Sequence, residues 1–197
     1  MESLLLKSVD DAVKAAETLR NPESLSFMRE ASSLIAEAYG KRKKLIIAGN
    51  GGSLCDAMHF AEEMTGQFRF KRRALPAIAL SDPAHISCVG NDYGFEEIFS
   101  RSVEALGEEG DVLVVLTTSG NSINILHAIK KAKEKNMRTI AFLGKTGGVL
   151  RGQCDLEWIV SGFPYSDRIQ EAHMAAIHII IELIEQKLFS SPYAVAK

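Results

Sequence analysis

The sequence predicts an α/β fold in which a parallel sheet is covered by helices on both faces. Short apolar runs with the length of buried strands alternate with segments of helical periodicity. Most of these runs are followed by loops rich in Gly, Ser, Thr or Asp, as expected where parallel strands end at a ligand site. The 197 residues suffice for one such domain with a substantial core.

Residues 1–40 are expected to form a helical arm that packs on the core. Asn21 and Pro22 are a helix-start signal, with Asn as the N-cap and Pro as the first helical residue. Apolar residues then recur every three or four positions, and Gly40 is expected to end the helix. The other boundaries that we predict are a single α/β domain over 41–190 and a tail over 191–197.

Five apolar runs are predicted as the strands of the sheet. They are Lys44–Gly49, Leu75–Leu80, Asp111–Thr118, Arg138–Gly144 and Leu156–Val160. A clear amphipathic helix over 122–136 separates the third run from the fourth. In the common flavodoxin-like order 2-1-3-4-5, the strand order reverses between strands one and three, so a ligand is expected at their carboxyl ends.

The last predicted helix, about Arg168–Leu188, is unusual because Ala175–Ile184 is apolar nearly all the way round. A helix without a polar face is usually buried on all sides. In so small a domain this predicts a subunit interface, with a central core helix as the alternative. The apolar stretch is too short to span a bilayer.

Composition excludes several classes of protein. The net charge of −2 does not indicate a nucleic-acid binder. The basic runs Lys41–Lys44 and Lys71–Arg73 are expected to be solvated edges or loops. Three widely spaced cysteines and the absence of a secretion signal favour reduced thiols in a cytosolic protein; these are Cys55, Cys88 and Cys154.

Two polar loops follow the first and third predicted strands. They are "GNGGS" (Gly49–Ser53) and "TTSGNS" (Thr117–Ser122), and each leads into a helix. Their backbone N–H groups and hydroxyls are suited to cradle an anion. Nucleotide fingerprints fit poorly, because Leu54 stands where a dinucleotide motif needs Gly and Thr139 where a P-loop needs Gly. A sugar phosphate fits the pair of loops better.

His59 and Glu63 lie four residues apart on the helix that follows the first loop, so they share one face. Glu62 is expected to point about a quarter-turn away. A surface His–Glu pair is the alternative to a shared ligand. The proximity of the pair to a phosphate-type loop makes a functional role as credible as a structural one.

Gln170, Met174 and His178 form a second ridge with a spacing of four residues on the last helix. His178 needs a partner in this apolar stretch, and spacing does not exclude His173 in its place. No role is assigned to His85 or His127. A His, Glu, Gln and His set offers nitrogen and oxygen ligands suited to zinc, nickel or similar ions.

Four stretches together resemble the phosphoheptose isomerase family, the sedoheptulose 7-phosphate isomerases of the SIS (sugar isomerase) fold. They are "GNGGSLCDAMHFAEEMTG", "ALSDPAHISCVGNDYGFEEIFSR", "TTSGNS" and "DRIQEAHMAAIHIIIELIE". The similarity runs from about Leu25 to Leu188. The "HFAEE" and "RIQE…H" pieces are more specific than "TTSGNS", which marks only an SIS domain.

The resemblance implies a three-layer α/β/α SIS domain in a cytoplasmic homotetramer, with interface helices at both ends and active sites between subunits. It implies the isomerisation of D-sedoheptulose 7-phosphate to D-glycero-D-manno-heptose 7-phosphate, the first step towards ADP-heptose for lipopolysaccharide. It also implies one Zn²⁺ per subunit, bound by His59, Glu63, Gln170 and His178. The substrate contacts that it implies are Asn50, Gly51, Gly52, Ser53, Glu63, Asn91, Asp92, Thr117, Thr118, Ser119, Ser122 and Gln170.

Ketose–aldose isomerisation moves a proton between C1 and C2, so it needs a base and an acid. We expect Glu63 to be the base and His178 the acid, with roles that exchange between the two halves of the reaction. Without the resemblance, a polar turn would explain Asn91 and Asp92 equally well. No nucleic-acid or membrane partner is expected.

Two alternatives remain at the level of sequence. One is a non-catalytic SIS protein that binds a replication initiator or senses a sugar phosphate. The other is an isomerase for a pentose or hexose phosphate, because the sequence does not fix the length of the substrate.

Overall fold

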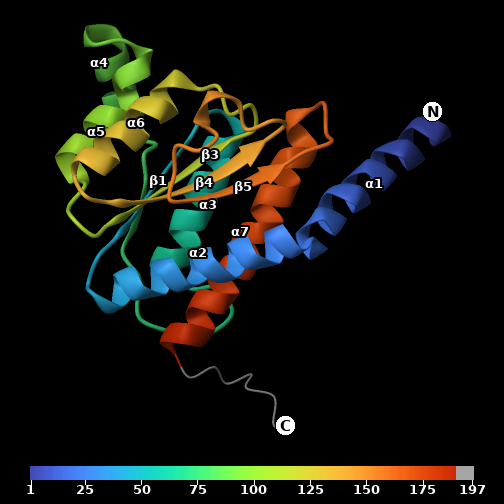
Figure 1. Cartoon of the computed structure of the whole chain (residues 1–197), viewed down its shortest axis with the longest axis horizontal. Helices are drawn as coiled ribbons and strands as arrows, with labels where there is room; N and C mark the ends of the chain where they lie inside the picture. Colours follow the sequence, from blue (N-terminus) through green and yellow to red (C-terminus); the bar gives the residue numbers. More distant parts are fainter. Residues whose placement is uncertain (190–197) are drawn as a thin grey trace.

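The computed structural model describes residues 1–189; the predicted tail over 191–197 lies outside the described residues. Seven α-helices and five strands follow one another along this part of the chain (Figure 1). The strands are β1 (Leu45–Gly49), β2 (Ala77–Ala79), β3 (Val112–Thr117), β4 (Arg138–Gly144) and β5 (Leu156–Val160). The helices are α1 (Glu2–Glu17), α2 (Pro22–Gly40), α3 (Gly52–Thr65), α4 (Pro83–Asp92), α5 (Ile98–Leu106), α6 (Ile123–Glu134) and α7 (Ser166–Leu188).

The five strands form one parallel sheet in the order β2-β1-β3-β4-β5, which confirms the predicted topology. β1 and β3 are neighbours in register, with Leu45 opposite Val112 and Gly49 opposite Leu116. The order in which successive strands join the sheet therefore reverses between β1 and β3. Their carboxyl ends, and the two polar loops that follow them, meet at the same edge of the sheet.

The side chains of the sheet alternate between two hydrophobic cores. On β1, Leu45 and Ile47 pack against α2, α3 and α7, whereas Ile46 and Ala48 pack against α4, α5 and α6. Because both faces of a parallel sheet are covered, its central strands are apolar throughout, as the sequence runs predicted. The structure is thus the expected three-layer α/β/α fold.

A few boundaries differ from those expected. β2 is shorter than the predicted 75–80, because it is an edge strand that pairs with β1 alone and Pro76 has no N–H to donate. Gly40 is the last residue of α2, and the left-handed residue that turns the chain is Arg42, with φ 60°. Asn21 is the N-cap residue of α2, but its side chain makes no capping hydrogen bond.

α7 lies between α2 and α3 and packs along both (Figure 1). Ile177, Ile180 and Ile184 are fully buried, whereas Ile179 is 36% exposed on the opposite side. The first part of α1 extends beyond the body of the molecule (Figure 1). Among the helices within residues 1–189, none has the length and apolar character needed to cross a membrane.

The two basic runs are not simply solvated, which corrects the expectation from sequence. Lys44 Nζ lies 2.7 Å from a carboxylate oxygen of the buried Asp111. Arg72 forms an ion pair with Glu185 on α7, and both side chains are only 1% exposed. Each run therefore supplies one cation to the interior.

His173 joins α7 to the sheet. Its ring is fully buried, and its Nε2–H donates to the carbonyl oxygen of Leu143 at the end of β4, 3.0 Å away. Nδ1 has no hydrogen-bond partner among the described residues. Burial lowers the pKa of this imidazole from 6.5 to about 4.

This pKa predicts acid sensitivity. The unfolded chain binds a proton at His173 near pH 6.5, before the folded protein does. The contribution of neutral His173 to the free energy of unfolding is therefore complete above pH 6.5, and it is lost as the pH falls towards 4. Between pH 7 and 4.5, the wild-type protein should lose about 2 kcal/mol more unfolding free energy than His173→Gln, which keeps a donor but does not titrate.

Urea denaturation at both pH values measures this difference, with both proteins treated with a chelator so that they carry no metal ion. Asp56, whose pKa is raised by burial to about 6, titrates in the opposite sense in both proteins and cancels in the comparison. If the two proteins lost equal amounts of unfolding free energy between pH 7 and 4.5, the lowered pKa of His173 would be contradicted.

Candidate active site

The first polar loop places a sharp turn between β1 and α3. Gly51 has φ 56°, a conformation that favours glycine. A Cβ on Gly49 would lie 2.5 Å from the backbone oxygen of Ser53, so the loop closes tightly on the strand. The N–H of Ser53 donates to the oxygen of Asn50, and that of Leu54 to Gly51. The turn thus brings the residues that start α3 next to the sheet edge.

The second polar loop is built around the hydroxyl of Thr117. It accepts a hydrogen bond from the N–H of Gly120 at 3.3 Å, and it lies 3.3 Å from the hydroxyl of Ser122. Gly120 has φ 66° and lies directly against the backbone of Gly147 in the next loop along the sheet. The loop therefore has a defined shape without a ligand.

Together the two loops line a small cavity of about 210 Å³. Most of the predicted substrate contacts converge here. The lining residues are Asn50, Ser53, Leu116, Thr117, Thr118, Ser119, Ser122, Ser166 and Gln170. None of these described residues carries a charge, so the polar groups of the cavity are hydroxyls and amides.

Two members of this region were missed from sequence. Asn124 on α6 is buried, and its amide exchanges two hydrogen bonds with that of Asn50, at 2.9 and 3.0 Å. Ser166, at the start of α7, accepts a hydrogen bond from the hydroxyl of Thr118 at 3.0 Å. Asn124 is the second residue after the "TTSGNS" motif, which was the available signal; Ser166 had none.

Gln170 lies near the start of α7, next to the two loops. A Cβ on Gly52 would be 2.5 Å from its amide nitrogen, so glycine at this position makes room for the Gln170 side chain. Gly51 and Gly52 shape the turn but do not line the cavity. Gln170 is eight residues, or about 12 Å along the helix axis, from His178.

His59, Glu63 and His178 come together at the contact between α3 and α7. Their possible ligand atoms all lie within 4.8 Å of one another. His59 Nε2 is 2.9 Å from His178 Nε2 and 3.6 Å from a carboxylate oxygen of Glu63. Side chains from two helices that are 119 residues apart in sequence thus form one group.

Glu62 belongs to this group more closely than expected. Its carboxylate is 3.0 Å from His59 Nδ1, whereas Glu63 faces the other ring nitrogen. Glu62 is turned away from Glu63 as expected, but it still contacts His59, because residues three apart on a helix are also neighbours. The Glu62 contact favours a proton on Nδ1, which leaves the Nε2 lone pair free for a ligand.

The environment shifts the pKa values of two members in useful directions. Burial raises the pKa of the Glu63 carboxyl, and the negative charge of Glu62 raises it further, against the effect of His59. Burial also lowers the pKa of the His178 imidazole, as do the positive charges of His59 and Arg69. The carboxylate of Glu63 is thereby more basic, and the neutral form of His178, the form in which an imidazole can bind a metal ion, is favoured.

The structure also decides between the two histidines of α7. They are five residues apart, or about 140° around the helix, so they occupy different faces. His178 faces α3, whereas His173 faces the sheet. Outside the group, His127 pairs with Glu97, and His85 contacts Ser102 and the Ile98 carbonyl.

Asn91 and Asp92 lie at the end of α4 and do not line the cavity. The amide of Asn91 donates to the carboxylate of Asp92 at 2.7 Å, and both residues are exposed. Their contact with substrate remains a prediction.

Comparison with known proteins identifies the family of the chain. A family model described as the SIS domain matches residues 10–144, more than half of the chain. The chain belongs to the SIS-domain family.

Within that family it belongs to the phosphoheptose isomerases. It is 50% identical to the phosphoheptose isomerase of Fusobacterium nucleatum over 96% of this chain and 92% of that protein. It is 52% identical to the phosphoheptose isomerase of Escherichia fergusonii over 89% of this chain and 93% of that protein. The solved structure of a phosphoheptose isomerase from Francisella tularensis superposes with a TM-score of 0.83 at 35% identity, covering 94% and 96% of the two chains. The solved structure of a phosphoheptose isomerase from Neisseria gonorrhoeae superposes with a TM-score of 0.81 at 36% identity, covering 94% of this chain and 96% of that chain.

Gly120→Ala tests the shape of the second loop. The new Cβ would overlap the Gly147 carbonyl and also take up a strained positive φ, so we expect a loss of at least about 3 kcal/mol. Gly152→Ala is the matched control, because φ there is 79° but a Cβ meets nothing within 4 Å. It should lose only about 1–2 kcal/mol. Denaturant unfolding measures both, and equal losses would show that Gly120 is needed only for its φ.

Proposed function

We propose that this protein isomerises D-sedoheptulose 7-phosphate to D-glycero-D-manno-heptose 7-phosphate, the first step towards ADP-heptose, in the cytoplasm. The observation that carries the proposal is the group formed by His59, Glu63 and His178 on the helices that also border the uncharged loop cavity. Relatives at 50–52% identity over most of the chain bear the name phosphoheptose isomerase. Nothing in the comparisons favours a non-catalytic protein.

The group of donors fits a divalent transition metal such as Zn²⁺. Tetrahedral zinc with ligand bonds near 2.1 Å separates its donor atoms by about 3.4 Å. The spacings of 2.9 and 3.6 Å from His59 Nε2 bracket that value. We propose one Zn²⁺ per subunit, held by His59, Glu63, Gln170 and His178. The ion would supply a positive charge that polarises the substrate carbonyl.

The side chains would carry out the proton transfers. Glu63, with its raised pKa, takes the proton from one carbon and returns it to the neighbouring carbon. His178 exchanges a proton with the substrate oxygen. The roles of ligand and base conflict in part, because a ligated carboxylate is less basic. We therefore propose that Glu63 changes its coordination when substrate enters.

The loop cavity would hold the phosphate end of the substrate. Asn50 and Ser53 line it from the first loop, and Thr117, Thr118, Ser119 and Ser122 from the second. The backbone of Gly51 and Gly52 would contact the substrate beside the cavity. Gln170 lines the cavity, and we propose that its amide would link the substrate to the ion. Asn91 and Asp92 would bind substrate hydroxyls.

Glu63→Gln should abolish most of the turnover. Loss of a positioned base costs about 10²–10⁴-fold in kcat, and the amide keeps the shape of the side chain. Glu62→Gln is the matched control, because it contacts His59 Nδ1 rather than the reacting side of the group; it should lose much less. Near-wild-type turnover of Glu63→Gln would overturn the assignment of the base.

Isotope exchange tests both the chemistry and the metal. The metal-loaded protein in D₂O should incorporate deuterium at C2 of a heptose phosphate made from sedoheptulose 7-phosphate, as followed by NMR. A chelator should abolish the exchange, and added Zn²⁺ should restore it. Exchange that survives chelation would remove the metal from the mechanism. No exchange under any condition would favour the binding-protein alternative.

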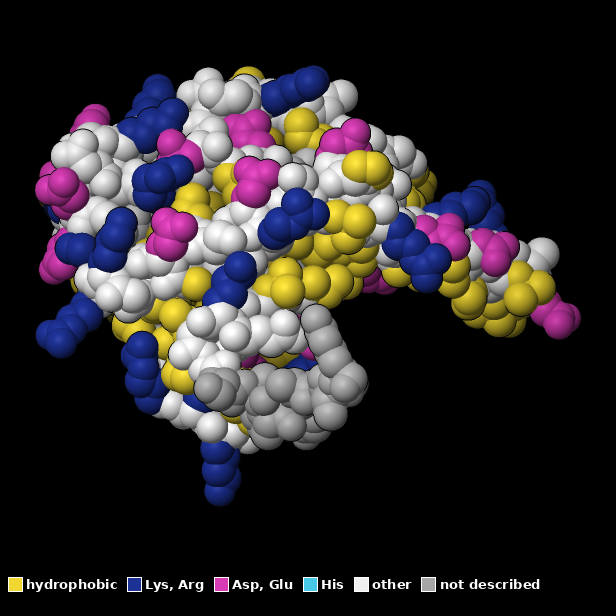
Figure 2. Space-filling model, turned by 60° about the horizontal axis from the view of Figure 1, so that its bottom comes forward, with side chains coloured by type: hydrophobic (Ala, Val, Ile, Leu, Met, Phe, Trp, Pro, Cys, Tyr) yellow, Lys and Arg dark blue, Asp and Glu magenta, His cyan; other side chains and the backbone are white. Residues whose placement is uncertain are grey.

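We also propose that the chain forms a homotetramer with active sites between subunits. The support is the apolar surface of α1, where Leu5 and Val9 are 63% and 58% exposed, together with Ile179 on α7. Figure 2 shows hydrophobic side chains along the projecting arm and on the body beside it. Exposed apolar surface of this extent is typical of an interface.

Charged substitutions on α1 test the assembly. The double variant Leu5→Glu/Val9→Glu should sediment as smaller species than the wild type, because burying two carboxylates in an apolar interface is unfavourable. Lys7→Glu changes a charge on the same helix and should leave the assembly intact. Sedimentation velocity distinguishes the species, and an unchanged profile for the double variant would show that α1 is not at the interface.

A further inference from the structure

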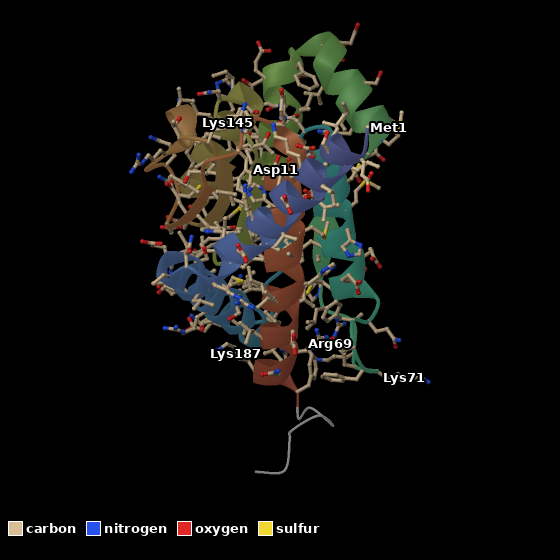
Figure 3. All side chains as sticks on the ribbon, turned by 90° about the vertical axis from the view of Figure 1, so that its right-hand side faces the viewer. Met1, Asp11, Arg69, Lys71, Lys145 and Lys187 are labelled. Carbon is tan, nitrogen blue, oxygen red and sulfur yellow. The ribbon has the colours of Figure 1, made fainter. Side chains whose placement is uncertain are left out.

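The loop that follows α3 runs back across the lower part of α7. Phe68 stacks on the ring of His178, with 5.7 Å between ring centroids and 22° between planes. Arg69 pairs with Glu182 one turn further along α7, at 2.5 Å. Figure 3 shows Arg69 beside the lower part of α7. Arg72 reaches Glu185, almost another turn on. This brace, residues 66–73, therefore lies along the ridge of α7 that begins at His178.

Arg72 is the member of the brace that contacts both helices. Its Nε donates to Glu185 at 2.8 Å. Its Nη2 donates to the backbone oxygen of Glu63 at 2.7 Å, and its Nη1 to that of Met64 at 2.8 Å. These are carbonyls of the last turn of α3, which have no partner within the helix. One guanidinium thus satisfies the end of α3 and a carboxylate of α7 together.

The Arg72–Glu185 pair is closed to water. Both side chains are 1% exposed, and Nη1 also lies 3.1 Å from the oxygen of Gly66. The second oxygen of Glu185 accepts from the N–H of Arg69 at 3.4 Å. Arg is suited to this place because its planar fork presents several donors in fixed directions, which Lys does not. The neighbouring Arg69–Glu182 pair is much more exposed, at 53% and 31%.

We propose that Arg72 is a positioning residue that sets the distance between the metal ligands on α3 and the ligand on α7. It holds the backbone of Glu63 directly, and through Glu185 it holds α7 two turns below His178. This inference rests on the proposed metal site formed by His59, Glu63 and His178. Groups that orient metal ligands typically contribute 10–100-fold in metal affinity.

The test compares Co²⁺ affinity by competition with a chromogenic chelator, without substrate and well below the melting temperature. Arg72→Lys and Arg72→Met should each bind Co²⁺ about 10- to 100-fold more weakly than the wild type. The visible spectrum of bound Co²⁺ should change, because the geometry of its ligands changes. Arg73→Gln, which removes the adjacent exposed charge, should bind like the wild type.

Two further variants separate positioning from stability. Leu113→Ala removes a side chain from the core on the other face of the sheet, so it should lower Tm but leave Co²⁺ affinity unchanged. In Arg72→Met/Glu185→Met no unpaired charge is buried, so Tm should recover relative to Arg72→Met. Its Co²⁺ affinity should stay low, because the carbonyl of Glu63 still lacks its donor.

Wild-type Co²⁺ affinity in Arg72→Met would overturn the proposal, as would affinity that follows Tm across all variants. The crystal structure of metal-free Arg72→Met gives an independent measurement. We expect the separation of residues 59 and 178 to change, and an unchanged separation would also overturn the proposal. If the wild type binds no transition metal, the proposed metal site is wrong, and this separation alone decides the role of Arg72.

Discussion

The contact between α3 and α7 is the constraint on which the candidate site depends. His59 and His178 are 119 residues apart in sequence, yet their Nε2 atoms lie 2.9 Å apart. Apolar packing brings the two helices together, because both contribute to the core on one face of the sheet. Apolar packing alone tolerates small shifts of a helix, whereas directional hydrogen bonds do not. The buried pair of Arg72 and Glu185 supplies directional hydrogen bonds between the loop after α3 and α7. His173 joins α7 to the end of β4 by another hydrogen bond.

The candidate site has two regions with different electrostatics. The loop cavity has an uncharged lining at the carboxyl ends of β1 and β3. The titratable group lies further along α3, where His59 is six residues, or about 9 Å, beyond Ser53. A substrate several carbons long can span this distance. The separation keeps the charges of Glu62 and Glu63 away from the place where a phosphate would bind.

The fold was predictable because its signals are local. Buried parallel strands must be apolar on both faces, so the five runs are visible in the sequence, and the loops that share an edge follow from the strand order. The residues that were missed depend on contacts between distant segments. Arg72 looks like part of a solvated basic run until Glu185, 113 positions away, lies against it. Spacing on α7 could not choose between His173 and His178, because the choice depends on which face meets α3. Asn124 and Ser166 gain their roles only when the loops are folded together.

The uncharged cavity has a consequence for how a phosphate would enter and leave. Hydroxyl and amide donors hold an anion by short-range dipoles, which depend strongly on geometry and weakly on ionic strength. Binding would therefore change little between dilute buffer and the salt concentration of a cell. Lysine and arginine, by contrast, attract any polyanion from a distance. A lining of neutral dipoles would respond mainly to the shape of the phosphate group, and it would release a product that carries the same phosphate without breaking an ion pair.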